Sequence, residues 1–171
     1  MRQVILFIST SLDGYIARTD GTIDWLFTDQ DYGYAAFFSG VDTVIMGRKT
    51  YEQTLTFGKF PYAGKECFVF SRSPGRGSDD RVVFLNEDSA ELVGRLRARP
   101  GKSIWLAGGA ELVRDFALKD LIDTYVISVH PLILGAGIPL FRAPLPLLTL
   151  VLCDTTTFNS GLVQLTYTRK R

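Results

Sequence analysis

The chain has 171 residues, 46% of them hydrophobic and 22% charged, so it is long enough to bury a sizeable core and too apolar for a disordered protein. A formal net charge of +1 provides no global field to attract nucleic acid or an anionic membrane. Two cysteines, Cys67 and Cys153, and one histidine, His130, cannot assemble a usual zinc site, so we expect no metal.

The first forty residues predict a strand, a long loop and a helix. Residues 4–9 are nearly all apolar and predict a central strand. This apolar run is too short for the core of a signal peptide or for a membrane span, so we expect a cytoplasmic protein. Residues 10–27 are mostly loop, with an Asp-Gly turn at Asp13. Helical spacing of aromatic residues predicts a helix over residues 30–39.

Strands and helices alternate through the middle of the chain. The pattern predicts a strand at 43–46, a helix from 48 that ends near 58, strands at 66–70 and 82–85, a helix at 89–99, a strand at 103–107, a helix through 119 and a strand at 122–129. Residues 74–80 are rich in glycine and serine and predict a mobile loop.

The end of the chain contains strands without helices. Residues 130–146 form a Gly/Pro-rich connection, and residues 147–153 and 162–168 predict a closing pair of strands. The order of elements predicts one α/β domain over residues 1–171. Its sheet should be largely parallel, with helices on both faces and an antiparallel C-terminal edge. In such sheets ligands bind beyond the carboxyl ends of the strands, where the turns after Ser9, Met46, Phe70 and Ala107 should meet.

Residues 42–52 have the outline of an anion site. A buried strand ends at Gly47, and Arg48, Lys49 and Thr50 open a helix whose free N–H groups and dipole favour a phosphate. From these residues alone, an ordinary strand-to-helix turn with solvated cations is an equally good interpretation. A second turn of the same kind at residues 104–111 favours the anion site.

Residues along the whole chain resemble known reductases. Residues 44–52 resemble the cofactor-phosphate segment of dihydrofolate reductases, residues 104–112 resemble that family's glycine-pair segment, and residues 70–72 lie where its third cofactor strand ends. Three further segments are similar to the reductase domain of the bifunctional riboflavin-biosynthesis enzyme: 11–17, 131–137 and 161–167. The resemblance implies a dihydrofolate reductase-like three-layer sandwich.

The resemblance implies NADPH as the cofactor. It assigns to cofactor binding Gly47, Arg48, Lys49, Thr50, Ser71, Arg72, Gly108, Gly109, Ala110, Glu111 and Leu112. An arginine at a strand end suits a 2′-phosphate, because its fork of donors matches the phosphate oxygens. The alternatives are a solvated loop charge for Arg72 and close helix–strand packing for Gly108 and Gly109.

The resemblance also indicates the substrate side. An ungapped count from Val44 places the family's acidic pterin-binding residue on Asp31, where a carboxylate would assist protonation of the ring being reduced. Asp29 and Asp31 are equally suited to stabilise the start of a helix, so that alternative stays open. The candidate wall residues of the cleft, each of which has core or loop packing as its alternative, are Ser9, Ile16, Trp25 and Tyr34.

Two departures from these families bear on the substrate. Lys65 stands where dihydrofolate reductases carry an arginine for the carboxylate of the folate tail, and lysine offers only a point charge. The Arg-rich substrate segment of the phosphoribosyl-uracil reductases is absent between Gly14 and Asp42. The pterin-, folate- and 5-amino-6-(5-phosphoribosylamino)uracil-like substrates therefore remain alternatives.

Two functional hypotheses stay open at this stage. The first is an NADPH-dependent reductase that transfers hydride to a small heterocycle. The second is an NADPH-binding regulatory module of the same fold without turnover. The apolar segment 130–153 indicates a homodimer, because so apolar an edge invites pairing with another copy. Cys67 and Cys153 lie in apolar runs and are expected to be buried free thiols, with a disulfide as the alternative.

Overall fold

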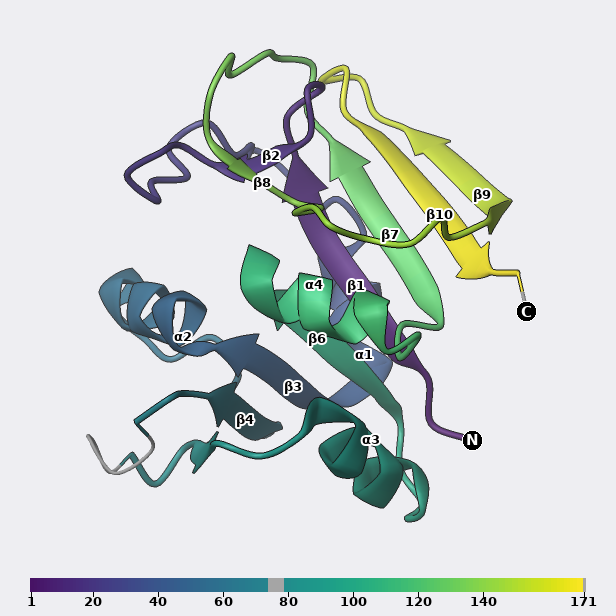
Figure 1. Cartoon of the computed structure of the whole chain (residues 1–171). Coiled ribbons are helices and arrows are strands. Elements are labelled where there is room, and N and C mark those ends of the chain that lie inside the picture. The colour runs from purple at the N-terminus through teal and green to yellow at the C-terminus, as the bar shows by residue number, and fades with distance from the viewer. Residues whose placement is uncertain (74–78, 171) are drawn as a thin grey trace.

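The computed structural model describes residues 1–73 and 79–170, and these build one eight-stranded sheet with helices around it (Figure 1). The strand order is β5-β4-β3-β6-β1-β7-β10-β9. In chain order the strands of this sheet are β1 (Val4–Thr10), β3 (Val41–Gly47), β4 (Glu66–Phe70), β5 (Val83–Leu85), β6 (Ser103–Gly108), β7 (Thr124–Val129), β9 (Leu150–Thr157) and β10 (Val163–Arg169). A separate two-stranded sheet pairs β2 (Tyr15–Ala17) with β8 (Ile138–Pro139).

The sheet is mostly parallel. The pairs β5–β4, β4–β3, β3–β6, β6–β1 and β1–β7 are all parallel, whereas β10 is antiparallel to both β7 and β9. The predicted α/β class with an antiparallel C-terminal edge is therefore confirmed. Because neighbouring parallel strands point the same way, their carboxyl ends lie along one edge of the sheet.

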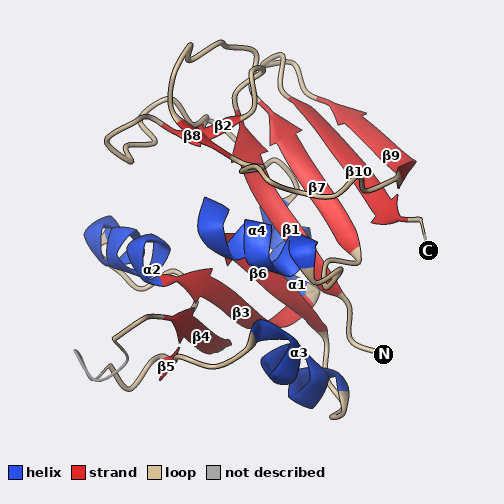
Figure 2. Cartoon of the chain, in the orientation of Figure 1, coloured by secondary structure: helices blue, strands red, loops and turns tan. Residues whose placement is uncertain are grey.

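Helices cover both faces of the sheet (Figure 2). They are α1 (Tyr34–Ser39), α2 (Arg48–Thr54) with the 3₁₀ turn Leu55–Phe57, α3 (Ser89–Arg97) and α4 (Ala110–Leu118). Alternate residues of each central strand serve two cores: Leu106 packs in one with Leu92 and Phe116, and Trp105 packs in the other with Tyr51. Helices α3 and α4 thus complete one core, and α1 and α2 complete the other.

Several predicted boundaries are wrong for identifiable reasons. The helix predicted over 30–39 begins only at Tyr34, because Tyr32 (φ 52°) and Gly33 (φ 78°) both have left-handed backbone. The last strands are Leu150–Thr157 and Val163–Arg169, since pairing with β10 extends β9 into polar residues. The other corrections add β2 within 10–27, add β8 within 130–146, and shorten the second and third helices.

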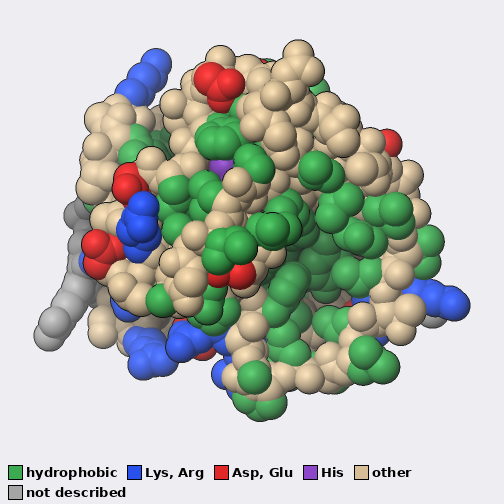
Figure 3. Space-filling view, turned by 90° about the horizontal axis from the view of Figure 1, so that it is seen from above, with side chains coloured by type: hydrophobic (Ala, Val, Ile, Leu, Met, Phe, Trp, Pro, Cys, Tyr) green, Lys and Arg blue, Asp and Glu red, His purple; other side chains and the backbone are tan. Residues whose placement is uncertain are grey.

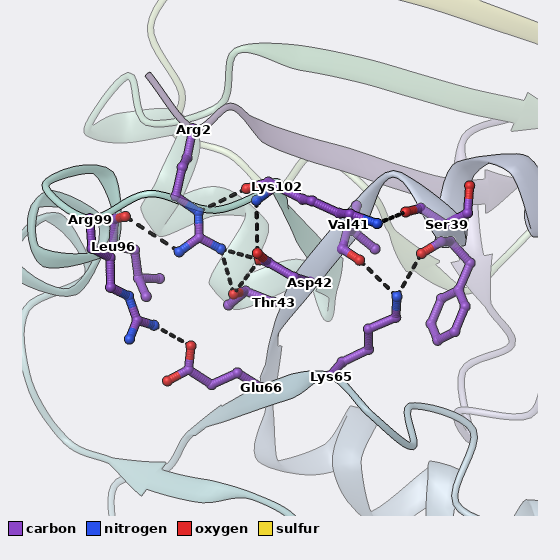
Figure 4. Close-up of polar contacts among 11 residues, drawn as sticks. Arg2, Ser39, Val41, Asp42, Thr43, Lys65, Glu66, Leu96, Arg99 and Lys102 are labelled. Carbon is purple, nitrogen blue, oxygen red and sulfur yellow. Dashed lines mark hydrogen bonds and ion pairs between the residues drawn. The ribbon is translucent and has the colours of Figure 1, made fainter.

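The starts of the strands at the opposite edge are joined by a polar network (Figure 4). The Arg2 side chain is only 4% exposed; it ion-pairs with Asp42 and donates to Thr43 Oγ1 (2.6 Å) and to the Lys102 carbonyl oxygen (2.8 Å). Asp42 also accepts from the Lys102 N–H (2.7 Å). These contacts tie the N-terminus, β3 and the segment before β6 to one another.

Lys65, just before β4, belongs to the same end of the molecule. Its Nζ donates to the carbonyl oxygens of Phe38 (2.8 Å) and Val41 (2.7 Å) and lies 4.2 Å from the centre of the Phe38 ring (Figure 4). Lys65 therefore caps the C-terminal end of α1 by donating hydrogen bonds to backbone carbonyl oxygens.

Both cysteines are free thiols, but only Cys67 is buried. Cys153 is exposed because β9 is the edge strand of the sheet, so the expectation of a buried thiol there is wrong. Of the loop predicted at 74–80, residues 74–78 lie outside the described residues. Among the described helices, none has the length and apolar character needed to cross a membrane.

Candidate functional site

Three glycines bring the carboxyl ends of β3 and β6 close together. A Cβ built on Gly47 would lie 3.7 Å from the Gly109 nitrogen, and one built on Gly109 would lie 3.4 Å from Thr50 Oγ1. Gly108 has φ +106°, and its Cβ would lie 3.4 Å from Ile8 Cδ1 on β1. We call Gly47, Gly108 and Gly109 the glycine junction; Gly108 is buried, and Gly47 and Gly109 are partly exposed.

Helices α2 and α4 begin directly at this junction. Gly47 and Gly109 are their N-cap residues, and neither helix start receives a side-chain cap. The first N–H groups of α4 therefore remain available to an acceptor from outside the chain. Lys49 is exposed, and Thr50, on α2, is half-buried beside Gly109.

Not all of the expected cofactor side chains point freely outward. Arg48 Nε donates to Glu52 (2.8 Å), and its guanidinium lies 5.1 Å from the centre of the Phe84 ring. Glu111 is exposed and ion-pairs with Arg142. Ala110 and Leu112 are both buried.

The end of β4 adjoins the end of β3, because Phe70 is the register partner of Gly47. Ser71 follows β4, its N–H bonded to the Leu85 carbonyl oxygen (2.8 Å) and its Oγ accepting from the Ser73 N–H (3.2 Å). Arg72 is exposed and makes no hydrogen bond or ion pair with any described residue. The fold therefore gathers the residues from the two glycine segments and the β4 end along one edge.

A cavity of about 400 Å³ lies farther along this edge, at β1 and β7. Aromatic and other apolar side chains line it together with polar ones. The lining residues are Phe7, Ser9, Phe27, Thr28, Gln30, Asp31, Tyr32, Tyr34, Ser128, His130 and Leu162. They come from the start and the end of the chain, so only folding brings them together.

His130 forms the buried end of this cavity. Its Nε2 accepts from the Phe27 N–H (3.2 Å), and its Nδ1 lies 3.4 Å from the Ser128 carbonyl oxygen. The Trp25 and Phe27 rings meet the imidazole edge-on, with centroids 5.2 and 4.8 Å away. Burial lowers the pKa of His130 below its ordinary value, so the ring is neutral at pH 7. In Figure 3 the histidine shows only as a small area among hydrophobic side chains.

A glutamine connects the two sides of the cavity. Gln164 Nε2 donates to Ser128 Oγ (3.0 Å) and to the Tyr32 carbonyl oxygen (3.3 Å). The Tyr32 hydroxyl in turn donates to Asp29 (2.6 Å). These bonds hold the segment before α1 against β7 and β10.

Asp31 stands at the start of α1 and also at the cavity, so its position is compatible with both roles predicted from the sequence. Its two carboxylate oxygens accept from the Ala35 N–H (3.0 and 3.2 Å), which stabilises the first turn of α1. It also lines the cavity. Burial, and after it the charge of Asp31, raise the pKa of Tyr34. Asp29 binds the Tyr32 hydroxyl instead, so the two carboxylates have different partners.

Two of the four predicted wall residues, Ser9 and Tyr34, line the cavity. Trp25 lies behind His130, and its buried Nε1 has no hydrogen-bond partner among the described residues. Ile16 packs against the core beside β1 instead. Sequence reasoning missed Ser128, although a serine at the end of an apolar strand is a signal of the same kind as Ser9.

A model of the RibD C-terminal domain matches residues 2–164. The chain belongs to the RibD C-terminal domain family. This confirms the resemblance to the reductase domain of the riboflavin-biosynthesis enzyme.

RibD C-terminal domain relatives match over the full length. Uncharacterized protein YwjB of Bacillus subtilis (strain 168) is 46% identical over 172 residues, which is 98% of each chain. A crystal structure from Shewanella sp. PV-4, of a protein named for riboflavin biosynthesis, is 33% identical with a TM-score of 0.88 over 99% of each chain. A bifunctional deaminase and 5-amino-6-(5-phosphoribosylamino)uracil reductase from Thermotoga maritima shares the fold, with a TM-score of 0.76 at 15% identity over 99% of this chain and 57% of that one.

Two of the three segments that resemble the RibD C-terminal domain outside the glycine junction, 11–17 and 131–137, are joined by hydrogen bonds. Asp13 accepts from the N–H groups of Leu134 (3.1 Å) and Gly135 (2.8 Å), and the Leu12 N–H donates to the Leu132 carbonyl oxygen (2.8 Å). The Ser11 hydroxyl, and after it these N–H groups, lower the pKa of Asp13. The loop after β1 is thereby fastened to the loop after β7.

Proposed function

We propose that this protein is an NADPH-dependent reductase that transfers a hydride to a small pyrimidine- or pterin-like heterocycle. One observation carries the proposal: the glycine junction and the aromatic cavity share the carboxyl edge of a parallel sheet, on either side of β1. That edge is where α/β sheets bind their ligands. Membership of the RibD C-terminal domain family supports a reductase.

The residues present fit a dinucleotide phosphate. Gly47 and Gly109 are partly exposed and add no side chains of their own, and among the described residues the start of α4 has no side-chain cap, so its N–H groups are candidate donors. Thr50 adds a hydroxyl beside Gly109, and Lys49 adds an exposed charge. NADPH, when bound, would supply the hydride.

Selectivity for NADPH over NADH rests on Arg72 and Ser71 in this proposal. Arg72 is exposed at the end of β4 and is not committed to any described partner. Arg48 stands next to this strand end but is already held by Glu52, so it contributes charge with less freedom to reorient. An arginine fork suits the 2′-phosphate that distinguishes the two cofactors.

On the substrate side the chain would orient the heterocycle and assist its protonation. The aromatic rings of the cavity would stack a planar heterocycle, and Ser9 and Ser128 would hydrogen-bond its edge. Asp31 lines the same cavity and is the proposed residue that assists protonation of the ring.

Cofactor titrations test the first half of the proposal. Each charge-assisted hydrogen bond contributes roughly 1.5–3 kcal/mol, so we expect NADPH to bind at least about tenfold more tightly than NADH. Arg72→Ala should weaken NADPH by a similar factor and leave NADH unchanged. Arg99→Ala, which removes an exposed arginine before β6, is the control. Equal affinities of the wild-type protein for the two cofactors would refute the assignment.

A turnover screen tests the second half. NADPH oxidation is followed with pterins, ribosylaminouracils and small carbonyl compounds as acceptors. We expect oxidation with at least one heterocycle. Tight NADPH binding with no oxidation by any acceptor would instead support a regulatory module without turnover.

A further inference from the structure

The cavity at β1 and β7 is lined by an acidic side chain and by no basic one among the described residues, apart from the histidine. Among the described residues, its lining contains no lysine and no arginine. Four of the lining residues are ionisable, namely Asp31, Tyr32, Tyr34 and His130. The protonation of these four side chains therefore sets the charge that a ligand meets in the cavity.

Three of the four provide no positive charge to the cavity. His130 is kept neutral by burial, and both of its ring nitrogens face backbone partners, the Phe27 N–H and the Ser128 carbonyl oxygen. Burial raises the pKa of Tyr34, which keeps its hydroxyl protonated. The Tyr32 hydroxyl donates a hydrogen bond to Asp29 (2.6 Å).

The acidic groups at this site are both aspartates. Asp31 lines the cavity, and Asp29 lies one hydrogen bond behind Tyr32. The hydrogen bond from Tyr32 is the main cause that lowers the pKa of Asp29, so Asp29 is ionised at neutral pH. The only cation that the resemblance offers for a substrate carboxylate, Lys65, is bound by the carbonyl oxygens of Phe38 and Val41.

We infer that the substrate of this site is a planar heterocycle that is neutral or cationic and carries neither a phosphate nor a carboxylate. The inference rests on the proposed reductase function and narrows its substrate class. A phosphate group needs arginine or lysine partners, or several free N–H donors, and beside two carboxylates it would be repelled. A neutral ring can stack on the aromatic walls with its faces and form hydrogen bonds to hydroxyl groups with its edge.

The experiment uses matched pairs of ligands that differ only in the anionic group. One pair is 5-amino-6-ribosylaminouracil and its 5′-phosphate, and the other is pterin and pterin-6-carboxylate. Binding to the full-length protein is measured by equilibrium dialysis with and without NADPH. We expect the member without the anion to bind at least about tenfold more tightly in one or both pairs.

A charge introduced into the wall provides an internal check. Thr28 is an exposed lining residue, and Thr28→Lys places a cation at the cavity. This variant should reduce the preference for the anion-free member by about fivefold or more. Asn86→Lys, which adds the same charge at an exposed position outside the lining, should leave the preference within about twofold of the wild-type value.

The outcomes separate the inference from the function on which it rests. Tighter binding of the phosphate or carboxylate member, or no binding of any anion-free member, would overturn the inference. Binding of the anion-free member without NADPH oxidation would leave the ligand class standing and count against the reductase. NADPH oxidation with the anionic members alone would support the reductase and overturn the ligand class.

Discussion

Removing the carboxylate of Asp42 perturbs the polar network at the start of β3. In Asp42→Ala the Arg2 guanidinium remains buried, with a side chain only 4% exposed, and loses its ion-pair partner. It keeps the Lys102 carbonyl oxygen and Thr43 Oγ1 as acceptors. The Lys102 N–H loses its acceptor at the same time. The cost therefore arises from one buried cation that is only partly satisfied and one exposed donor that turns to water.

The magnitude follows from this partial compensation. Breaking a fully buried ion pair costs roughly 3–5 kcal/mol, but the Asp42 side chain is 39% exposed, and water can take its place. We expect a loss of about 2–3 kcal/mol in the free energy of unfolding. At about 2–4 °C per kcal/mol for a chain of this size, Tm should fall by about 4–12 °C.

Thermal denaturation followed by circular dichroism measures the effect. Arg99→Ala is the matched control: its ion pair with Glu66 is about half exposed on both sides, so Tm should change by no more than about 2 °C. The affinity for NADPH at room temperature should be unchanged in Asp42→Ala, because the polar network and the glycine junction lie at opposite ends of β3. Equal Tm losses in the two variants would refute the reasoning.

Low pH offers a further test of the same network. Burial raises the pKa of Asp42, but the hydrogen bonds from Lys102 and Thr43 and the charge of Arg2 outweigh it and lower the pKa overall. A lowered pKa in the folded state stabilises the fold above the unfolded value of about 3.9, and the effect is lost as the pH falls through the folded value. The Tm difference between wild type and Asp42→Ala should therefore shrink below about pH 4.

Four more measurements address the site and the assembly. Asp31→Asn should lower turnover by about a hundred- to ten-thousand-fold with NADPH affinity unchanged, whereas Asp29→Asn should stay near wild type; equal rates for both would exclude a role for the Asp31 carboxylate in protonation. Gly108→Ala should cost about 1–2 kcal/mol in unfolding experiments, because its φ is +106°. Burial lowers the pKa of His130, the only histidine, so the unfolded chain takes up a proton at a higher pH than the folded one. The free energy of unfolding should therefore fall by at most about 1.4 kcal/mol per pH unit as the pH drops below ~6.5. His130→Gln should abolish this contribution. Light scattering should detect a homodimer that Leu152→Lys, on the exposed edge strand β9, converts to monomer; a wild-type monomer at micromolar concentrations would contradict this.

The sheet was predictable because its signals are local. Continuous apolar runs such as 43–46 and 103–107 mark parallel strands that are buried on both faces, and the glycines that follow them mark the turns. The start of α1 was not predictable in the same way, since the left-handed backbone at Tyr32 is imposed by its bonds to distant residues, among them Gln164. The extension of β9 likewise depends on its pairing with β10.

The cavity could be predicted only in part, for a related reason. The sequence indicated Ser9 because it ends the first apolar strand, and it indicated Asp31 through the count back from Val44. Ser128, His130 and Leu162 join them only because β7 and β10 fold beside β1. The neutral state of His130 depends on its burial behind Trp25 and Phe27, and no pattern of neighbouring residues encodes that environment.

The loops after β1 and β7 form one structural unit. Asp13 holds Leu134 and Gly135, the short strands β2 and β8 pair with each other, and a Cβ on Gly137 would come within 2.3 Å of the Ala17 carbonyl oxygen. A grafted loop that lacks Asp13 would leave the Leu134 and Gly135 N–H groups without this acceptor, and one with a side chain at position 137 would drive its Cβ into the Ala17 carbonyl oxygen. Chimeras of this scaffold should therefore exchange the two loops together, and an insertion accepted by one should require a compensating change in the other.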